Sequence, residues 1–135
     1  MKPRIFIDAG GWYLAYYMGM WEYILEEFGR ESFKGVYFDG ASAGGQVATT
    51  IIASIYGDKQ MKFWLQTGPK LAVECDKYGI GRLTDGIQST GFIFYNNLNE
   101  TQRRAICKYV RVFCTDSLYI TPTKEKNETS FLMVM

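Results

Sequence analysis

Two short apolar runs, each leading through a glycine-rich turn into a helical pattern, constrain the fold of this chain more than any other feature. The runs cover residues 5–7 and 36–38, as expected for short buried strands. Apolar residues recur at three- and four-residue spacing over positions 17–28, which predicts an amphipathic helix. An alanine-rich, β-branched stretch at 46–56 predicts a buried helix. The order strand, helix, strand, helix predicts an α/β fold with a mostly parallel sheet.

The pattern is weaker in the second half of the chain. Residues 59–65 favour a short helix, which a later Gly-Pro pair would break, and residues 82–86 favour a turn. An apolar run at 92–95 favours a strand. Asn99 is a suitable N-cap, so residues 99–110 are predicted to form a helix.

The net charge and the lack of histidine exclude several classes of function. The chain of 135 residues has 15 basic and 14 acidic side chains, so it offers no strong field to attract a nucleic-acid backbone. It contains no histidine. Hydrolases that need an imidazole base, and zinc sites with histidine ligands, are therefore excluded. Apolar residues make up 47% of the chain, which fits a single globular domain.

The cysteines and the apolar stretches bear on localisation. Cys75, Cys107 and Cys114 are odd in number and lack metal-binding spacing, which favours a reducing compartment and no bound metal. The apolar run before Asp8 is too short for the core of a signal peptide. The longest uncharged stretch, residues 41–57, contains polar residues and glycines unlike those of a membrane span. We expect a cytoplasmic protein, soluble or peripheral on membranes.

A serine lies in the turn between the second apolar run and the helix after it. Small residues surround Ser42 on both sides, namely Gly40, Ala41, Ala43 and Gly44. A nucleophile elbow needs such residues because its backbone is strained and its strand and helix approach each other closely. The helix would also direct its free N–H groups toward an oxyanion formed beside the serine. The pattern predicts a nucleophile at Ser42; the alternative is a serine that only caps the helix.

A second glycine-rich turn follows the first apolar run. Parallel strands deliver their C-terminal loops to the same edge of a sheet, so this turn is expected to lie near Ser42. The backbone N–H groups of Gly10, Gly11 and Trp12 are therefore candidates for an oxyanion hole. A phosphate-binding turn or a plain strand-to-helix connection is the alternative. A dinucleotide site is disfavoured because the G-x-G-x-x-G spacing is incomplete.

Over about its first 57 residues the chain resembles the patatin-like phospholipases, a family of serine acyl hydrolases. The segment IFIDAGGWYLAYYMGMWEYILEE resembles their first strand, oxyanion loop and first helix, and VYFDGASAGGQVATTIIAS resembles their nucleophile strand, elbow and helix. The resemblance implies a three-layer α/β/α sandwich, here incomplete at its C-terminal end. It also implies a Ser-Asp dyad that works without histidine or cofactor. Ala9 and Leu14 depart from the family's glycine pattern in the oxyanion loop.

The resemblance further implies a catalytic aspartate in an Asp-Gly loop well downstream of the serine. Asp85, followed by Gly86, is the candidate base. Its separation from Ser42 is shorter than the family normally uses, and the string GRLTDG is equally similar to a non-catalytic family segment. A plain turn residue is the alternative for any Asp-Gly pair. The weaker candidates for the base are Asp8, which is expected to support the oxyanion turn, Asp39 and Asp116.

Two functions follow from these residues. The first is a lipid acyl hydrolase that cleaves the ester of a phospholipid or glyceride through an acyl-enzyme. The second is a truncated, inactive relative that binds lipid or a protein partner without turnover. Residues 1–121 are expected to form the shortened domain and 122–135 a mobile tail. The expected partners are a lipid or acyl-ester substrate and a membrane or lipid-droplet surface, and no nucleic acid.

Aromatic residues gather beside the proposed site, at positions 12, 13, 16, 17 and 21. At helical spacing such residues are predicted to belong to the core. The alternative is an apolar wall for an acyl chain, or a contact with a lipid surface.

Overall fold

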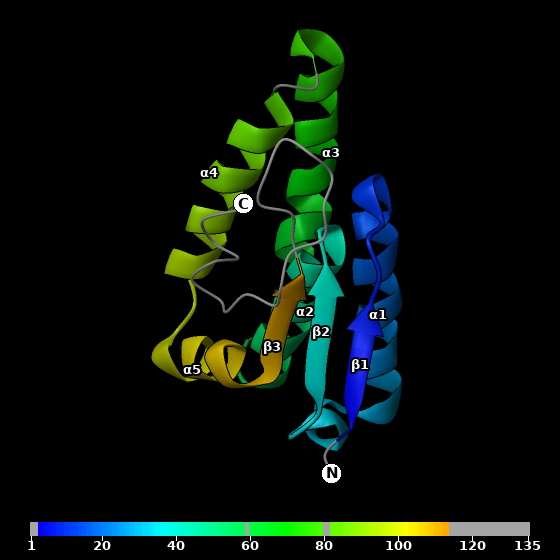
Figure 1. Ribbon diagram of the computed structural model, residues 1–135, viewed down its shortest axis with the longest axis vertical. Coiled ribbons are helices and arrows are strands. Elements are labelled where there is room, and N and C mark those ends of the chain that lie inside the picture. Colours follow the sequence, from blue (N-terminus) through cyan, green and yellow to red (C-terminus); the bar gives the residue numbers. More distant parts are fainter. Residues whose placement is uncertain (1–2, 59, 80–81, 114–135) are drawn as a thin grey trace.

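The protein adopts an α/β fold built on a parallel sheet (Figure 1). The computed structural model describes residues 3–58, 60–79 and 82–113, with the backbone alone for Trp12 and for residues 82–88. The expected α/β class and parallel sheet are confirmed.

Three strands make up the sheet in the described part of the chain. They lie in the order β1-β2-β3 and are β1 (Arg4–Ile7), β2 (Tyr37–Ala41) and β3 (Val110–Phe113). Ile7 pairs with Gly40, and Gly40 pairs with Val112 on the other side. The carboxyl ends of all three strands therefore lie at nearly the same level, at one edge of the sheet.

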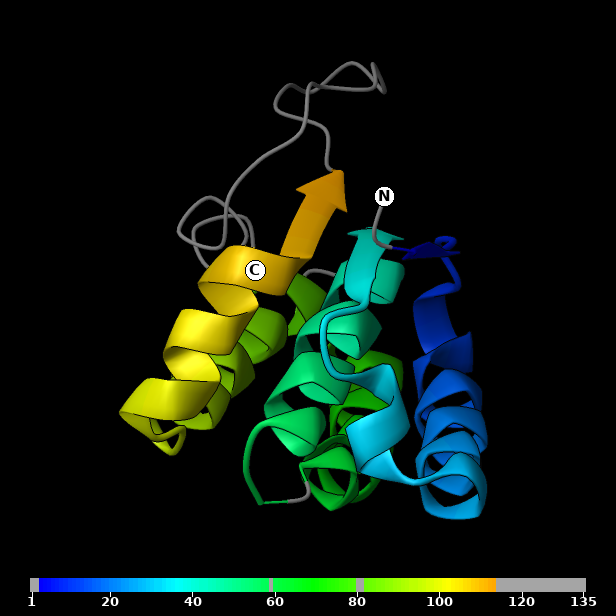
Figure 2. The same cartoon turned by 90° about the horizontal axis from the view of Figure 1, so that it is seen from below.

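The five α-helices of the described residues all lie on one side of the sheet (Figure 2). Right-handed crossovers that advance in one direction, from β1 to β2 to β3, place every connection on the same face. The helices are α1 (Leu14–Phe28), α2 (Ala43–Ile55), α3 (Met61–Tyr78), α4 (Arg82–Asn96) and α5 (Glu100–Tyr109), with the short 3-10 helices η1 (Gly11–Tyr13) and η2 (Arg30–Phe33). The second helical layer of a three-layer sandwich is thus not found among the described residues.

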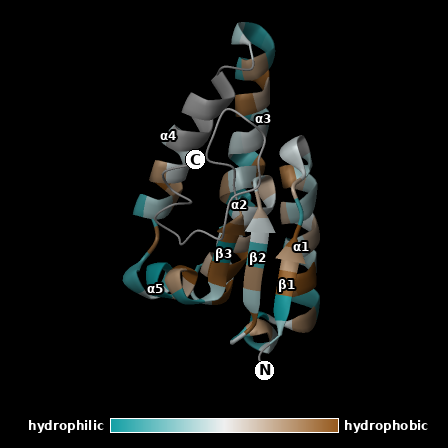
Figure 3. Cartoon of the chain, in the orientation of Figure 1, coloured by the Kyte–Doolittle hydropathy of each residue, from teal (hydrophilic) through white to brown (hydrophobic). Residues whose placement is uncertain are grey.

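Helix α2 forms the centre of the core. All of its residues are buried, and it packs against the three strands and against α1 and α5. Hydrophobic residues on β1 and β3, on either side of β2, are visible in Figure 3. The hydroxyls of Thr49, Thr50 and Ser54 each donate to the carbonyl four residues earlier at 2.8 Å. These polar side chains are therefore tolerated in a buried helix.

Several elements of the first half and one of the second were predicted correctly. α1 is followed by Gly29, whose φ of 80° is one that glycine adopts readily. Asn99 and Gln102 form a capping box at the start of α5, with hydrogen bonds of 2.8 and 3.0 Å. The buried helix is also confirmed, although it begins at Ala43, directly after Ser42, rather than at position 46.

Four expectations for the second half of the chain are wrong. α3 continues through Gly68 and Pro69, because its two halves are held by packing against α1 and α4. The turn at 82–86 and the strand at 92–95 both belong to α4. Phe94 is buried against Trp64, with ring centroids 5.5 Å apart, while Phe92 and Ile93 are exposed; this is the pattern of a helix that covers a core with one face.

The fourth error concerns the end of α5. Val110 was expected to continue the helix, but it begins β3, which follows α5 without a connecting loop. Residues 122–135, the predicted tail, and the boundary at 121 lie outside the described residues. In the part of the chain that the structure describes, no helix combines the length and the apolar character needed to cross a membrane.

Candidate active site

Ser42 lies at the carboxyl end of β2, the central strand, in a strained backbone conformation. Its φ is 52° and its ψ is −121°, and it is the one non-glycine residue with a positive φ among those described. Residue 42 is exposed, and α2 begins at the next position. An exposed serine on a strained strand-to-helix turn is the geometry of a nucleophile elbow.

The glycines that flank the serine are required by close backbone contacts. A Cβ at Gly40 would collide with the carbonyl group of Gly44. A Cβ at Gly44 would collide with the carbonyl oxygen of Ile7 and lie 2.7 Å from that of Asp8. Because neither position has room for a side chain, the elbow packs tightly on β1 only with glycine at both.

The side chain of Ser42 does not act as a helix cap. Ser42 occupies the N-cap position of α2, yet within the described structure its side chain makes no capping hydrogen bond. The turn is closed by the backbone instead, since the Gly45 N–H donates to the Ser42 carbonyl at 2.9 Å. The first N–H groups of a helix have no acceptor inside the helix, so Ala43 and Gly44 present donors at the end where the hydroxyl lies.

β1 brings the second glycine-rich turn beside the elbow. Because Ile7 pairs with Gly40, the two turns leave the sheet at nearly the same level. Gly11 has a φ of 51° and open space where a side chain would stand. Gly10 is packed against the ring of Tyr17, and its carbonyl accepts the N–H of Tyr13 at 2.9 Å. The predicted proximity of the two turns is met, while the oxyanion role of residues 10–12 stays a prediction.

β3 holds the other side of the elbow, and the sequence reasoning missed it. The N–H of Ser42 donates to the carbonyl of Phe113, the last residue of β3, at 3.2 Å. The alternation of valine with arginine and phenylalanine at 110–113 is a signal of a strand. It was overlooked because it directly follows a well-capped helix.

Asp39 is engaged elsewhere and is not available as a base. Its carboxylate accepts two hydrogen bonds from Arg4, at 3.0 and 3.1 Å, and two from Arg111, at 3.0 and 2.8 Å. These three residues lie on adjacent strands, on the sheet face away from the helices. Burial by itself would raise the pKa of Asp39, but the hydrogen bonds from Arg111 and Arg4 outweigh it and lower the pKa below its ordinary value.

The remaining acidic candidates are placed only in part. Asp8 accepts the N–H of Ala9 at 2.8 Å, so it stabilises the turn before Gly10. The backbone of Asp85 lies in the first turns of α4, not in the expected loop, and its side chain lies outside the described residues. Figure 1 shows that the start of α4 lies beyond the carboxyl edge of the sheet. Asp116 also lies outside the described residues.

Known proteins offer no direct guide to this site. The chain matches no family model, no curated protein and no solved structure. Within the described part of the chain, no group of three or more histidine, cysteine or acidic side chains is placed to hold a metal ion.

Proposed function

We propose that this chain is a serine acyl hydrolase that cleaves carboxylic esters of lipids, with Ser42 as its nucleophile. The observation that carries the proposal is the φ of 52° at an exposed serine between a strand and a buried helix. Such strain persists only where the surrounding structure imposes it, and it is concentrated at functional sites. Here the turn is held by the close backbone contacts at Gly40 and Gly44 and by the hydrogen bond from the Ser42 N–H to Phe113.

The chemistry needs a base, a nucleophile and an oxyanion hole. The Ser42 Oγ would attack the acyl carbonyl while Asp85 accepts its proton, since no histidine is available. The N–H groups of Gly10, Gly11, Trp12 and the first turn of α2 would stabilise the oxyanion. Asp85 would return the proton to the leaving alcohol, and water, activated in the same way, would then release the acid from the acyl-enzyme.

The resemblance to patatin-like phospholipases supports a lipid ester as the substrate. On this proposal, the described sheet and helices are two layers of a patatin-like sandwich, and the protein works in the cytoplasm at the surface of a membrane or lipid droplet. The order of the first elements, with a glycine-rich turn after β1 and a serine turn after β2, is the arrangement that the resemblance implies.

One observation favours the second function, binding without turnover. The family's catalytic aspartate lies in a loop, whereas the backbone of Asp85 is helical. A chain with an intact elbow and no base within reach would still bind an acyl ester, but it would hydrolyse the ester very slowly.

Hydrolysis of short-chain p-nitrophenyl esters and of phospholipid in mixed micelles tests the proposal. We expect measurable hydrolysis by the wild type, lost in Ser42→Ala and in Asp85→Asn, and unchanged in Ser32→Ala, which alters another exposed serine. In Gly11→Asn the new side chain tolerates the positive φ and occupies the open space at this turn, so we expect slower hydrolysis because the acyl oxygen has less room beside the N–H of residue 11. A folded wild type without activity would favour binding alone, and full activity in Asp85→Asn would identify another base.

A further inference from the structure

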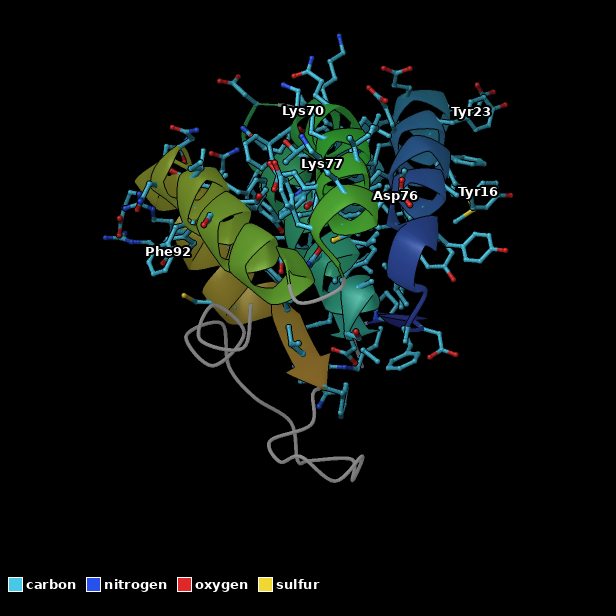
Figure 4. All side chains as sticks on the ribbon, turned by 90° about the horizontal axis from the view of Figure 1, so that it is seen from above. Tyr16, Tyr23, Lys70, Asp76, Lys77 and Phe92 are labelled. Atoms are coloured by element: carbon cyan, nitrogen blue, oxygen red, sulfur yellow. The ribbon has the colours of Figure 1, made fainter. Side chains whose placement is uncertain are left out.

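Four large side chains form an exposed stripe along the first helical segment. They follow one another at spacings of three, four and three residues and are Tyr13, Tyr16, Met20 and Tyr23, here called the outer stripe. Their exposed fractions are 72%, 67%, 39% and 64%, respectively. Figure 4 shows Tyr16 and Tyr23 pointing away from the body of the molecule on the same side of α1. The expectation that Tyr13 and Tyr16 belong to the core is therefore wrong.

The outer stripe lies opposite the face with which α1 is already packed. The buried residues of α1 are Met18, Trp21 and Leu25, and Trp21 contacts Phe38 of β2 with ring centroids 5.4 Å apart. A helix that is apolar on two opposite faces normally has a partner on each. The second face of α1 is exposed in the described structure, and exposed apolar surface of this kind marks interaction sites.

The chemistry of the outer stripe suits the boundary between lipid and water. Three of its members are tyrosines, whose rings are apolar and whose hydroxyls remain hydrated, as in the aromatic belts of membrane proteins. None of the four is charged. The charged residues of α1 are Glu22, Glu26 and Glu27, with no lysine or arginine. This charge opposes an anionic membrane or a nucleic acid and favours a neutral or zwitterionic surface.

The size of the outer stripe is unfavourable for a stable dimer. An aromatic side chain buries roughly 150–250 Å², so four partly exposed side chains offer on the order of 500 Å². A stable interface buries about 800 Å² on each partner. A second copy of this chain is therefore a poorer occupant than a lipid surface.

The outer stripe is also connected to the candidate site. The ring of Tyr16 packs edge to face on Tyr17 at 6.3 Å, and Tyr17 in turn lies against Gly10. Tyr13 belongs to η1, directly after the Gly10–Gly11 turn. A lipid surface in contact with the outer stripe would thus lie beside the turn that borders Ser42.

We propose that the outer stripe of η1 and α1 docks the protein on a zwitterionic lipid surface and presents that surface to Ser42. The second half of this statement rests on the proposed hydrolase function; the docking itself does not. The two are separated by measuring binding in Ser42→Ala, which cannot turn over an ester.

Flotation with phosphatidylcholine vesicles tests the docking. We expect Ser42→Ala to float with the vesicles, and the added triple change Tyr13→Ser, Tyr16→Ser and Tyr23→Ser to reduce the bound fraction at least about tenfold. The matched control is Phe92→Ser with Ile93→Ser, which removes equally exposed apolar side chains from α4 and should leave binding unchanged. Circular dichroism of each variant checks that the fold is kept.

Several results would overturn the docking. They are no binding to phosphatidylcholine, equal binding by the triple variant and its control, binding only when phosphatidylserine is present, and a dimer that the triple variant dissociates. Vesicle binding without any ester hydrolysis by the wild type would leave the docking intact and remove the hydrolase function. Hydrolysis of soluble esters without vesicle binding would remove the docking and leave the hydrolase function intact.

Discussion

Ser42 can be interpreted as a helix cap or as a strained nucleophile elbow, and the two interpretations predict different changes in the free energy of unfolding when the serine is replaced. If the serine were a helix cap, its replacement by alanine would cost about 1 kcal/mol and replacement by glycine a few tenths. The conformation at φ 52° and ψ −121°, without a capping hydrogen bond, leads to different expectations. Strain there costs the folded state on the order of 1–3 kcal/mol, and glycine relieves it.

We therefore expect Ser42→Gly to raise the free energy of unfolding by about 1 kcal/mol, after allowing for the greater freedom of glycine in the unfolded chain. Ser42→Ala should change it by less than about 0.5 kcal/mol, because alanine keeps the strain and no cap is lost. Urea unfolding followed by circular dichroism measures both. Destabilisation by alanine of about 1 kcal/mol would support the cap instead.

Asp39 provides a second prediction, about acid stability. Its folded-state pKa is lowered, so its stabilising effect is fully present above the unfolded-state pKa, near 3.8, and is lost as the pH falls through the lower folded value. Asp39→Asn should cost about 1–3 kcal/mol at neutral pH, a range kept low because the Arg4 and Arg111 side chains are 38% and 35% exposed. The difference in stability between the wild type and the variant should therefore begin to shrink as the pH falls below 3.8 and should continue to shrink as the pH falls through the lower folded-state pKa.

Urea midpoints between pH 2.5 and 7 test this expectation. Asp76→Asn, which alters an exposed carboxylate on α3, is the control and should follow the wild type (Figure 4). A constant difference between wild type and Asp39→Asn over the whole range would show that the carboxylate charge is not the stabilising feature.

Among the elements, those with strong local signals were predicted from the sequence and those defined by packing were not. β1, α1, β2 and the serine turn combine apolar runs with glycines, and α5 has a capping box, so each is identified from neighbouring residues. α3 and α4 pack against each other, and this packing overrides the break expected at the Gly-Pro pair and the strand expected at 92–95. Residues 110–113 form β3 because they pair with β2, a contact between segments far apart in the sequence.

The site follows the same division. The strand-to-helix turn at Ser42 could be predicted because the close approach of α2 to β1 requires residues without side chains around the serine, whereas the catalytic role of Ser42 stays a prediction. The contribution of Phe113 could not be predicted, because the hydrogen bond that it accepts from Ser42 joins residues far apart in the sequence. The loop around Asp85 was wrong because an Asp-Gly pair also fits a helix that is held by its neighbour.

Two glycines of the helical layer should respond in opposite ways to the same change. In Gly44→Ala the new Cβ would meet the carbonyl groups of Ile7 and Asp8, and we expect a loss of roughly 3 kcal/mol. In Gly19→Ala the Cβ meets open space on α1, and alanine is the better helix former, so a gain of about 0.5–1 kcal/mol is expected.

Thermal and urea unfolding of the two variants give this comparison directly. Failure of Gly44→Ala to fold, beside a stabilised Gly19→Ala, agrees with the expectation. If Gly44→Ala were as stable as the wild type, the strand and the helix would not approach as closely as described.

In the molecule as a whole, one face of the sheet is covered and the other is not. Helices pack on the inner face (Figure 2). The other face carries the exposed Phe6, whose ring centroid lies 6.0 Å from that of Phe113. The ion pairs of Asp39 lie on the same face. In the described residues, the elbow, the glycine-rich turn and the end of β3 meet at one edge of this sheet. These three features position Ser42, and from its position we expect its hydroxyl to be reactive.

Covalent labelling by a fluorophosphonate measures that reactivity most directly. After incubation with the probe, mass spectrometry of peptides from wild type, Ser42→Ala and Ser32→Ala locates and counts the modified residues. We expect one modification, on Ser42, in wild type and in Ser32→Ala, and none in Ser42→Ala, because an activated serine reacts far faster than other hydroxyls. A folded wild type that is not labelled, or equal labelling of Ser42→Ala, would contradict the assignment of Ser42 as the nucleophile.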